Sequence, residues 1–238
     1  ILPGYKVIES IPKPAPVLHR EDSLSRRPSS SQACGKLGRY RGSARTRLRG
    51  RMRDMIRIIG GRPAPPGKWP WQVVVLNRYK EAICGGTLVS LRWVVTAAHC
   101  IRRVLYVRLG EHDLFVRQRG EREMRVMEAV VHPRYDPDTV LNDVAMLRLP
   151  VPARPDLGHG VVCLPQPHSN LAPHTSCIIL GWGKKRATDV HGTRVLHEAQ
   201  GITSFGDGCG KRGKYGVYTR TAGYITWMKS VMNNAYFD

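Results

Sequence analysis

The sequence predicts an all-β fold that ends in one short helix. Three features support this prediction: short apolar runs, Gly and Pro residues between them, and little helical periodicity. The apolar runs cover residues 71–76, 86–89, 93–97, 106–109, 144–149 and 177–180. Runs of this length, separated by turn-forming residues, are typical of strands in a closed antiparallel barrel or a sandwich. We therefore expect strands to form most of the folded part.

The last apolar stretch, residues 224–232, has a different pattern. Ile225, Met228 and Met232 are spaced three or four residues apart and so would share one face of a helix. No convincing long amphipathic stretch precedes it. We expect a short C-terminal helix that closes the domain.

The first 57 residues differ in composition from the rest. Residues 1–33 carry Pro, Ser and charged residues without any periodic pattern, which predicts a disordered tail. Cys34 directly follows this stretch. From Ile58 onward the strand-like pattern begins. The sequence thus divides into a basic, Pro/Ser/Arg-rich propeptide or linker over 1–57 and a folded domain over 58–238.

The chain is strongly basic, with 38 Lys and Arg against 18 Asp and Glu and a net charge of +20. Alternating arginines between residues 36 and 57 would suit a polyanion such as nucleic acid, a heparin-like sugar or acidic lipid. A solvated, protease-sensitive linker is the simpler interpretation. Tyr40 alone interrupts the run, so it offers little aromatic surface on which bases could stack.

No membrane span is predicted, because every apolar run is far shorter than the roughly 18 residues that a membrane helix needs. The sequence starts at Ile1. We expect any signal peptide to lie upstream of this residue or to have been removed.

A series of motifs between residues 57 and 238 resembles the chymotrypsin/trypsin-like serine protease family, in the order found in that family. The motifs are Arg57-Ile58-Ile59-Gly60-Gly61, Trp69-Pro70-Trp71-Gln72, Cys84-Gly85-Gly86-Thr87-Leu88, Thr96-Ala97-Ala98-His99-Cys100, Asn142-Asp143-Val144-Ala145, Cys163-Leu164-Pro165, Gly181-Trp182-Gly183 and Gly216-Val217-Tyr218-Thr219-Arg220. The resemblance implies two packed antiparallel β-barrels of trypsin-like type with a catalytic cleft between them. In this chain the second barrel is expected to be truncated.

The resemblance assigns two catalytic residues, His99 and Asp143. In such a triad a neutral imidazole takes the proton of a serine, while a buried carboxylate fixes its tautomer. Asp143 precedes an apolar strand, where an unpaired carboxylate would be costly, so it needs a partner such as His99. We expect His112, His132 and His197 to be structural. No cofactor and no metal is expected.

The segment that would hold the nucleophile is missing. In the family a Gly-Asp-Ser-Gly-Gly-Pro turn lies between the strand that ends at 196–199 and the strand over 201–206, whereas here only Gln200 separates them. The serine, the N–H groups of the oxyanion hole and the aspartate at the floor of the specificity pocket are therefore absent. Ser204, Phe205 and Gly206 match the family's substrate-docking strand.

Activation is affected as well. The resemblance places the activating cleavage of the zymogen between Arg57 and Ile58. The new amine would pair with an aspartate beside the nucleophile, which is also missing. The other serines after Ile58 stand in no glycine turn, so we expect no useful hydrolysis by this chain.

The six cysteines carry further expectations from the resemblance. Cys84 and Cys100 match the disulfide of the histidine loop, and Cys34 and Cys163 match the bridge that keeps a cleaved propeptide attached. Cys177 and Cys209 normally pair with cysteines of the absent segment and would here be free, mispaired or joined to each other. Disulfides and family together predict a secreted, extracellular protein.

Three functional hypotheses remain open. The first is a trypsin-like endopeptidase, acting on protein substrates and bound by protein inhibitors, whose sequence here reflects a skipped exon or incomplete gene model at Gln200–Gly201. The second is a secreted noncatalytic homologue that acts as a cascade cofactor or binds a polyanion through residues 36–57. The third, a basic nucleic-acid-binding protein, rests on charge alone.

Overall fold

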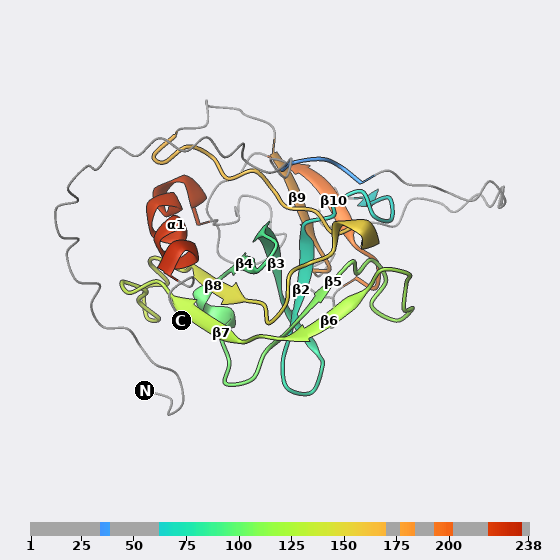
Figure 1. The fold of residues 1–238 in the computed structure, drawn as a ribbon, viewed down its shortest axis with the longest axis horizontal. Coiled ribbons are helices and arrows are strands. Elements are labelled where there is room, and N and C mark those ends of the chain that lie inside the picture. Colours follow the sequence, from blue (N-terminus) through green and yellow to red (C-terminus); the bar gives the residue numbers. More distant parts are fainter. Residues whose placement is uncertain (1–33, 39–61, 170–176, 184–192, 202–218, 235–238) are drawn as a thin grey trace, which may run out of the picture.

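The computed structural model describes residues 34–38, 62–169, 177–183, 193–201 and 219–234. Within these ranges the protein is mostly β, with two antiparallel sheets and one α-helix near the C-terminus (Figure 1). The predicted all-β class with a short C-terminal helix is confirmed.

The larger sheet has seven strands and contains most of the hydrophobic core. Its order is β6-β5-β2-β3-β4-β8-β7, with antiparallel neighbours throughout, and it curls around its own apolar side chains. The strands are β2 (Gln72–Leu76), β3 (Ala82–Ser90), β4 (Trp93–Thr96), β5 (Tyr106–Leu109), β6 (Arg122–Arg125), β7 (Glu128–Val131) and β8 (Ala145–Arg148). This curled half-barrel sheet is consistent with the first barrel of the predicted trypsin-like fold.

The smaller sheet has three strands in the part of the chain that the structure describes. Its order is β1 (Arg62–Pro63), β10 (His197–Gly201) and β9 (Cys177–Gly181). Gly201 was expected to begin a new strand, and this was wrong. Gln200 and Gly201 pair with Ile178 and Cys177, so β10 continues across the junction. A single intervening residue leaves no chain for a turn, and the extended backbone follows β9 instead.

Three short 3₁₀ segments and one helix complete the described structure. They are η1 (Ala98–Cys100), η2 (Pro155–Leu157), η3 (Thr221–Gly223) and α1 (Ile225–Asn234). Ile225 and Met228 are fully buried, and Met232 packs at the edge of the same cluster. No helix among the described residues is long and apolar enough to cross a membrane.

Strands β4 and β8 are buried on both faces. Val94 and Leu147 belong to the core inside the curled sheet, whereas Trp93 and Met146 pack against residues of α1. Alternate residues of a strand face opposite sides, so a strand covered on both sides needs apolar residues at every position. This explains why these two strands read as continuous apolar runs.

Strands β6 and β7 were not predicted. In β6 only Met124 is buried, and charged residues flank it on the exposed positions. Met124 fills the core below the sheet while Arg108 and Glu123 pair on its surface at 2.9 Å. A strand with one buried side chain has no apolar run to reveal it.

Glu198 connects the small sheet to the segment before β2. Its side chain is 5% exposed, and its carboxylate accepts hydrogen bonds from Arg62 Nε at 2.9 Å, Lys68 Nζ at 2.8 Å and Trp69 Nε1 at 2.8 Å. Burial alone would raise the pKa of Glu198. The hydrogen bonds from Lys68, Trp69 and Arg62 outweigh burial, so the pKa lies below its usual value.

Replacing Glu198 by alanine should destabilise the protein much more than removing its exposed partner. Glu198→Ala leaves Lys68 and the Trp69 indole N–H without their acceptor, and we expect a loss of about 3 kcal/mol in the free energy of unfolding. Arg62 has a side chain that is 79% exposed, so Arg62→Ala should cost about 0.5 kcal/mol or less. Denaturant unfolding of both variants measures the difference, and equal losses would contradict this role for Glu198.

Four of the described histidines are buried, namely His112, His132, His159 and His197, and three of them have a lowered pKa. His112, His132 and His159 are 8%, 6% and 3% exposed, and burial lowers the pKa of each. In His159, Nδ1 accepts from the N–H of Arg154 at 3.1 Å and Nε2 bonds to the carbonyl of Gly120 at 2.8 Å. Burial lowers the pKa of His159, and it outweighs the Gly120 hydrogen bond, which alone would raise it. Protonation would remove the acceptor at Nδ1.

These histidines predict a loss of stability at mildly acidic pH. The unfolded chain takes up protons near the ordinary histidine pKa of about 6.5, whereas the folded protein takes them up only at lower pH. The unfolded state therefore binds more protons below about pH 6.5, and the free energy of unfolding should fall as the pH drops from 7 to 5. Denaturant unfolding across this range tests it. His159→Gln should reduce the slope, and a flat profile would contradict the prediction.

Candidate active site

The pairing of β4 with β8 brings His99 and Asp143 together. Thr96, at the end of β4, lies opposite Ala145, at the start of β8. Because the strands are antiparallel, the residues that follow β4 and those that precede β8 emerge at the same edge of the sheet. His99 follows Thr96 by three positions and Asp143 precedes Ala145 by two.

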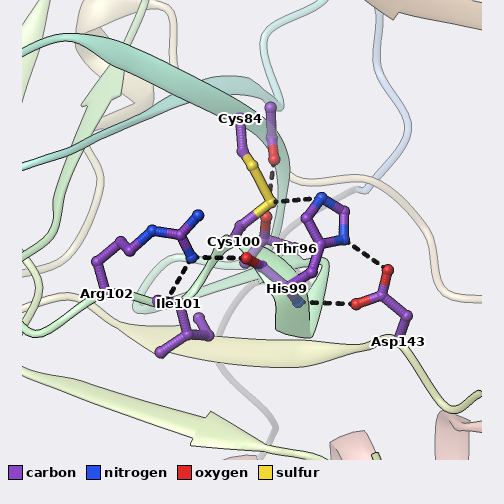
Figure 2. Close-up of a disulfide and its surroundings, with 8 residues drawn as sticks. Cys84, Thr96, His99, Cys100, Ile101, Arg102 and Asp143 are labelled. Carbon is purple, nitrogen blue, oxygen red and sulfur yellow. Dashed lines mark hydrogen bonds and ion pairs between the residues drawn. A yellow bond between two sulfur atoms is a disulfide. The ribbon is translucent and has the colours of Figure 1, made fainter. Parts of the chain in front are cut away.

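His99 stands in the short turn η1, which is fixed from both sides. The disulfide between Cys84 of β3 and Cys100 joins this turn to the sheet. The hydroxyl of Thr96 donates to the carbonyl of Gly85 at 2.8 Å (Figure 2). The disulfide therefore ties the turn itself to β3, and the hydrogen bond ties the end of β4, which leads into the turn, to the same strand.

The carboxylate of Asp143 holds both the backbone and the ring of His99. Oδ1 accepts from the His99 N–H at 2.9 Å, and Oδ2 lies 2.7 Å from Nδ1 (Figure 2). The Asp143 side chain is 12% exposed and the His99 side chain 58% exposed. In the neutral imidazole this contact places the proton on Nδ1 and leaves the lone pair on Nε2. Such a pair can accept a proton at Nε2 and stabilise the resulting imidazolium.

Asn142 fixes the backbone at Asp143. It has a positive φ of 55°, in the left-handed region that asparagine tolerates better than most residues. Its Nδ2 donates to the carbonyl of Arg134 at 2.7 Å, and its Oδ1 accepts from the hydroxyl of Tyr224 at 3.1 Å. Thr219 Oγ1 also donates to the Asp143 carbonyl at 3.0 Å. Thr219 and Tyr224, which precede α1, thus hold the backbone of the loop that carries Asp143.

Sequence reasoning missed this role of Asn142, Tyr224 and Thr219. Asn142 and Thr219 belong to motifs that carry the family resemblance, but the sequence analysis assigned neither residue a role. Their partners are remote in the chain, with Asn142 and Tyr224 82 positions apart, and no local pattern indicates such a contact.

The other ring nitrogen of His99 faces the disulfide. Nε2 lies 3.5 Å from Cys100 Sγ, on the side of the ring opposite Asp143 (Figure 2). The ligand atoms of Cys84, His99 and Cys100 lie within 4.8 Å of one another, a spacing that could hold a metal. Both sulfurs are in the disulfide and cannot act as thiolate ligands, so the chemistry of this donor set does not fit a metal ion.

The structure also joins Cys34 to Cys163 across 129 residues. The short segment around Cys34 adds two backbone hydrogen bonds to the domain, from Gly35 N to Val161 O at 2.8 Å and from Gly38 N to Lys68 O at 3.1 Å. Both disulfides that the resemblance implied are thus present. Residues 34–38 are attached to the domain independently of the chain that follows them.

Several residues singled out in the sequence lie outside the described residues. They are Arg57 and Ile58 of the expected cleavage site, Ser204, Phe205 and Gly206 of the expected docking strand, and Cys209. Cys177 begins β9, but its side chain is not described.

Comparisons with known proteins agree with this arrangement. The family model Trypsin matches residues 58–198 and 190–228. Serine protease 56 of Homo sapiens is 32% identical over 235 residues, covering 74% of this chain and 39% of that protein. Trypsin-4 of Rattus norvegicus is 30% identical over 230 residues, covering 76% and 92%. Vitamin K-dependent protein C of Oryctolagus cuniculus is 28% identical over 284 residues, covering 88% and 61%.

The chain spans only part of the first of these relatives. It covers 39% of the length of Serine protease 56 and about three fifths, 61% and 58%, of the vitamin K-dependent proteins C of Oryctolagus cuniculus and Mus musculus.

Substitutions at Asn142 should separate its two contributions. Asn142→Gly and Asn142→Ala both lose the amide hydrogen bonds to Arg134 and Tyr224, but only alanine resists the left-handed backbone. We expect Asn142→Ala to be less stable than Asn142→Gly by about 1 kcal/mol. Denaturant unfolding of the two variants measures this difference. If alanine were as stable as glycine, the left-handed conformation at this position would not be a constraint on the site.

Proposed function

This chain belongs to the trypsin family of serine proteases, and we propose that in its present form it has kept the histidine–aspartate pair but cannot hydrolyse peptide bonds. The intact enzyme of this type would be a trypsin-like endopeptidase. In it, serine, histidine and aspartate transfer an acyl group from a protein substrate to water.

The surroundings of His99 Nε2 carry this proposal. Among the described residues the polar neighbour of this nitrogen is Cys100 Sγ, and no serine hydroxyl bonds to it. Ser90 lies on β3, where its oxygen accepts from the Arg92 N–H, and Ser230 lies in α1. A base without a hydroxyl to deprotonate cannot start acyl transfer.

The structure around the junction of Gln200 and Gly201 supports the inference that the serine-bearing segment is absent. Gln200 and Gly201 pair with successive residues of β9, which is consistent with a strand that runs on instead of opening into a loop. The family model matches in two overlapping parts instead of one continuous stretch. The similarity to Trypsin-4 extends over 230 positions although it uses 76% of this 238-residue chain, as expected if the chain lacks an internal segment.

The residues that remain can contribute little to the rate of peptide-bond hydrolysis. His99 could still take a proton from water at Nε2, with Asp143 stabilising the imidazolium. Removing the triad serine alone lowers kcat by about a millionfold, and the residual rate then depends on the oxyanion hole and on substrate binding. With the oxyanion donors missing too, we infer that no measurable peptidase activity is left.

The remaining parts fit a secreted zymogen-like organisation. We assign residues 1–57 to a propeptide or linker and 58–238 to the protease domain, with activating cleavage between Arg57 and Ile58. The Cys34–Cys163 disulfide would keep the first part attached after cleavage. Two disulfides favour an oxidising, extracellular location.

The alternative is a noncatalytic homologue that works by binding, as a cofactor in a protease cascade or through the arginines of residues 36–57. The complete first sheet favours this alternative, since it offers a stable surface for a partner. Sequencing of full-length transcripts across the codons for Gln200 and Gly201 separates the two. A longer form that encodes Gly-Asp-Ser-Gly-Gly-Pro would identify the parent as an active protease, and consistent recovery of the short form favours the binding role.

The proposal predicts that this chain does not react with fluorophosphonates. After cleavage at Arg57–Ile58 it should show no covalent labelling and no hydrolysis of Arg- or Lys-containing peptide amides above the buffer rate. Insertion of the corresponding Trypsin-4 segment between Gln200 and Gly201 should restore labelling. The same insertion with alanine in place of its serine is the matched control. Labelling of the unmodified chain that is lost in His99→Ala would overturn the proposal.

A further inference from the structure

The disulfide between Cys84 and Cys100 lies beside the imidazole of His99. Cys100 Sγ is 3.5 Å from His99 Nε2, while Asp143 Oδ2 is 2.7 Å from Nδ1 of the same ring (Figure 2). The imidazole therefore stands between a sulfur atom and a carboxylate. When His99 is protonated, Asp143 stabilises the imidazolium and Nε2–H is directed at Cys100 Sγ. This arrangement is suited to stabilise negative charge on the sulfur of Cys100.

The two sulfurs of this disulfide have different surroundings. Cys100 is 2% exposed, whereas Cys84 is only half-buried. The rate of thiol–disulfide exchange depends on access to the sulfur that is attacked and on the stability of the thiolate that leaves. Access favours attack on Cys84, and the position of His99 Nε2 favours Cys100 as the leaving thiolate. Both criteria select the same direction of exchange.

We propose that Cys84 is a site of reversible modification by low-molecular-mass thiols such as glutathione, with His99 stabilising the leaving thiolate. The thiolate of the incoming molecule attacks Cys84 Sγ, a disulfide forms between the two, and the Cys84–Cys100 bond breaks. The incoming sulfur is oxidised, and Cys100 Sγ is reduced to a thiolate that takes the proton of His99 Nε2. The incoming thiol loses its proton to water, and His99 regains one from water. One thiol is thus consumed and one is formed, at Cys100.

The turn that carries Cys100 keeps other attachments when the disulfide opens. The carbonyl of His99 accepts from Arg102 Nη1 at 2.7 Å, and the N–H of His99 donates to Asp143 Oδ1 at 2.9 Å. Cys100 directly follows His99 in the chain, so its thiol stays close to the imidazole. Attack of this thiol on the modified Cys84 then expels the small molecule and closes the bridge again. The modification is therefore reversible.

The disulfide between Cys34 and Cys163 serves as an internal reference. Both of its cysteines are exposed, whereas His99 lies at the other disulfide. A change at His99 should therefore affect one bridge and leave the other unaltered. The exchange needs neither a serine nor a peptide substrate, so this inference is independent of the proposed function.

The test incubates the full chain with reduced glutathione at neutral pH, after its free thiols have been blocked with N-ethylmaleimide. Acid stops the exchange, new thiols are alkylated with iodoacetamide in denaturant, and mass spectrometry locates both labels. We expect glutathione on Cys84 and the new alkyl group on Cys100. Glutathione found mainly on Cys100 would overturn the proposed direction of exchange.

Replacing His99 should slow the exchange at this bridge alone. His99→Ala should slow the opening of the Cys84–Cys100 bridge about tenfold, because the leaving thiolate loses its neighbouring cation. The opening of the Cys34–Cys163 bridge, followed in the same sample, should change less than about twofold. His168→Ala is the matched control, since it removes an exposed imidazole from another loop. It should leave both rates unchanged within the same limit.

A purely structural role of His99 predicts the opposite sign. Loss of the bond between its ring and Asp143 would loosen the turn and expose the disulfide, so that the bridge would open faster. Asp143→Asn keeps the shape of the side chain but removes the charge that stabilises the imidazolium, and it should also slow the opening. Faster or unchanged opening in either variant would overturn the proposal. Circular dichroism on each variant ensures that rates are compared between folded proteins.

Discussion

The antiparallel pairing of β4 with β8 is the constraint on which the rest of the site depends. It brings the turn after Thr96 and the loop before Ala145 to one edge of the sheet. Both strands are buried on both faces, by the curled sheet on one side and by α1 on the other. A shift of one residue in register would turn every buried side chain to the opposite face. The packing that fixes this register therefore fixes the separation of His99 and Asp143.

Much of the first sheet could be predicted because its strands are either fully apolar or end in recognisable motifs. Strands β2, β4, β5 and β8 coincide with apolar runs, and α1 with helical spacing of Ile225 and Met228. Strands β6 and β7 could not be found this way, since their burial is partial and charged residues interrupt it. The continuation of β10 through Gly201 was missed because the break in family pattern suggested a break in structure.

The site residues likewise divide into those that the sequence predicted and those that only the tertiary structure reveals. His99 and Asp143 were identified by resemblance, because the residues around them form local motifs. Asn142, Tyr224 and Thr219 support Asp143 from positions that meet only after α1 has packed on the sheet. Burial of α1 against Trp93 and Met146 is thus what brings Tyr224 to Asn142. Contacts of this kind need the tertiary structure, and neither propensity nor spacing indicates them.

The geometry of His99 and Asp143 by itself says little about catalysis in this chain. Among the described residues, the hydrogen bonds that form and support the pair come from η1, from the loop before β8 and from the segment before α1. The pair forms because β4, β8 and α1 pack together and because a buried carboxylate needs a donor. Folding therefore retains the pair whether or not a serine follows it. The state of His99 Nε2, which faces a disulfide at 3.5 Å, is the feature that reports on activity.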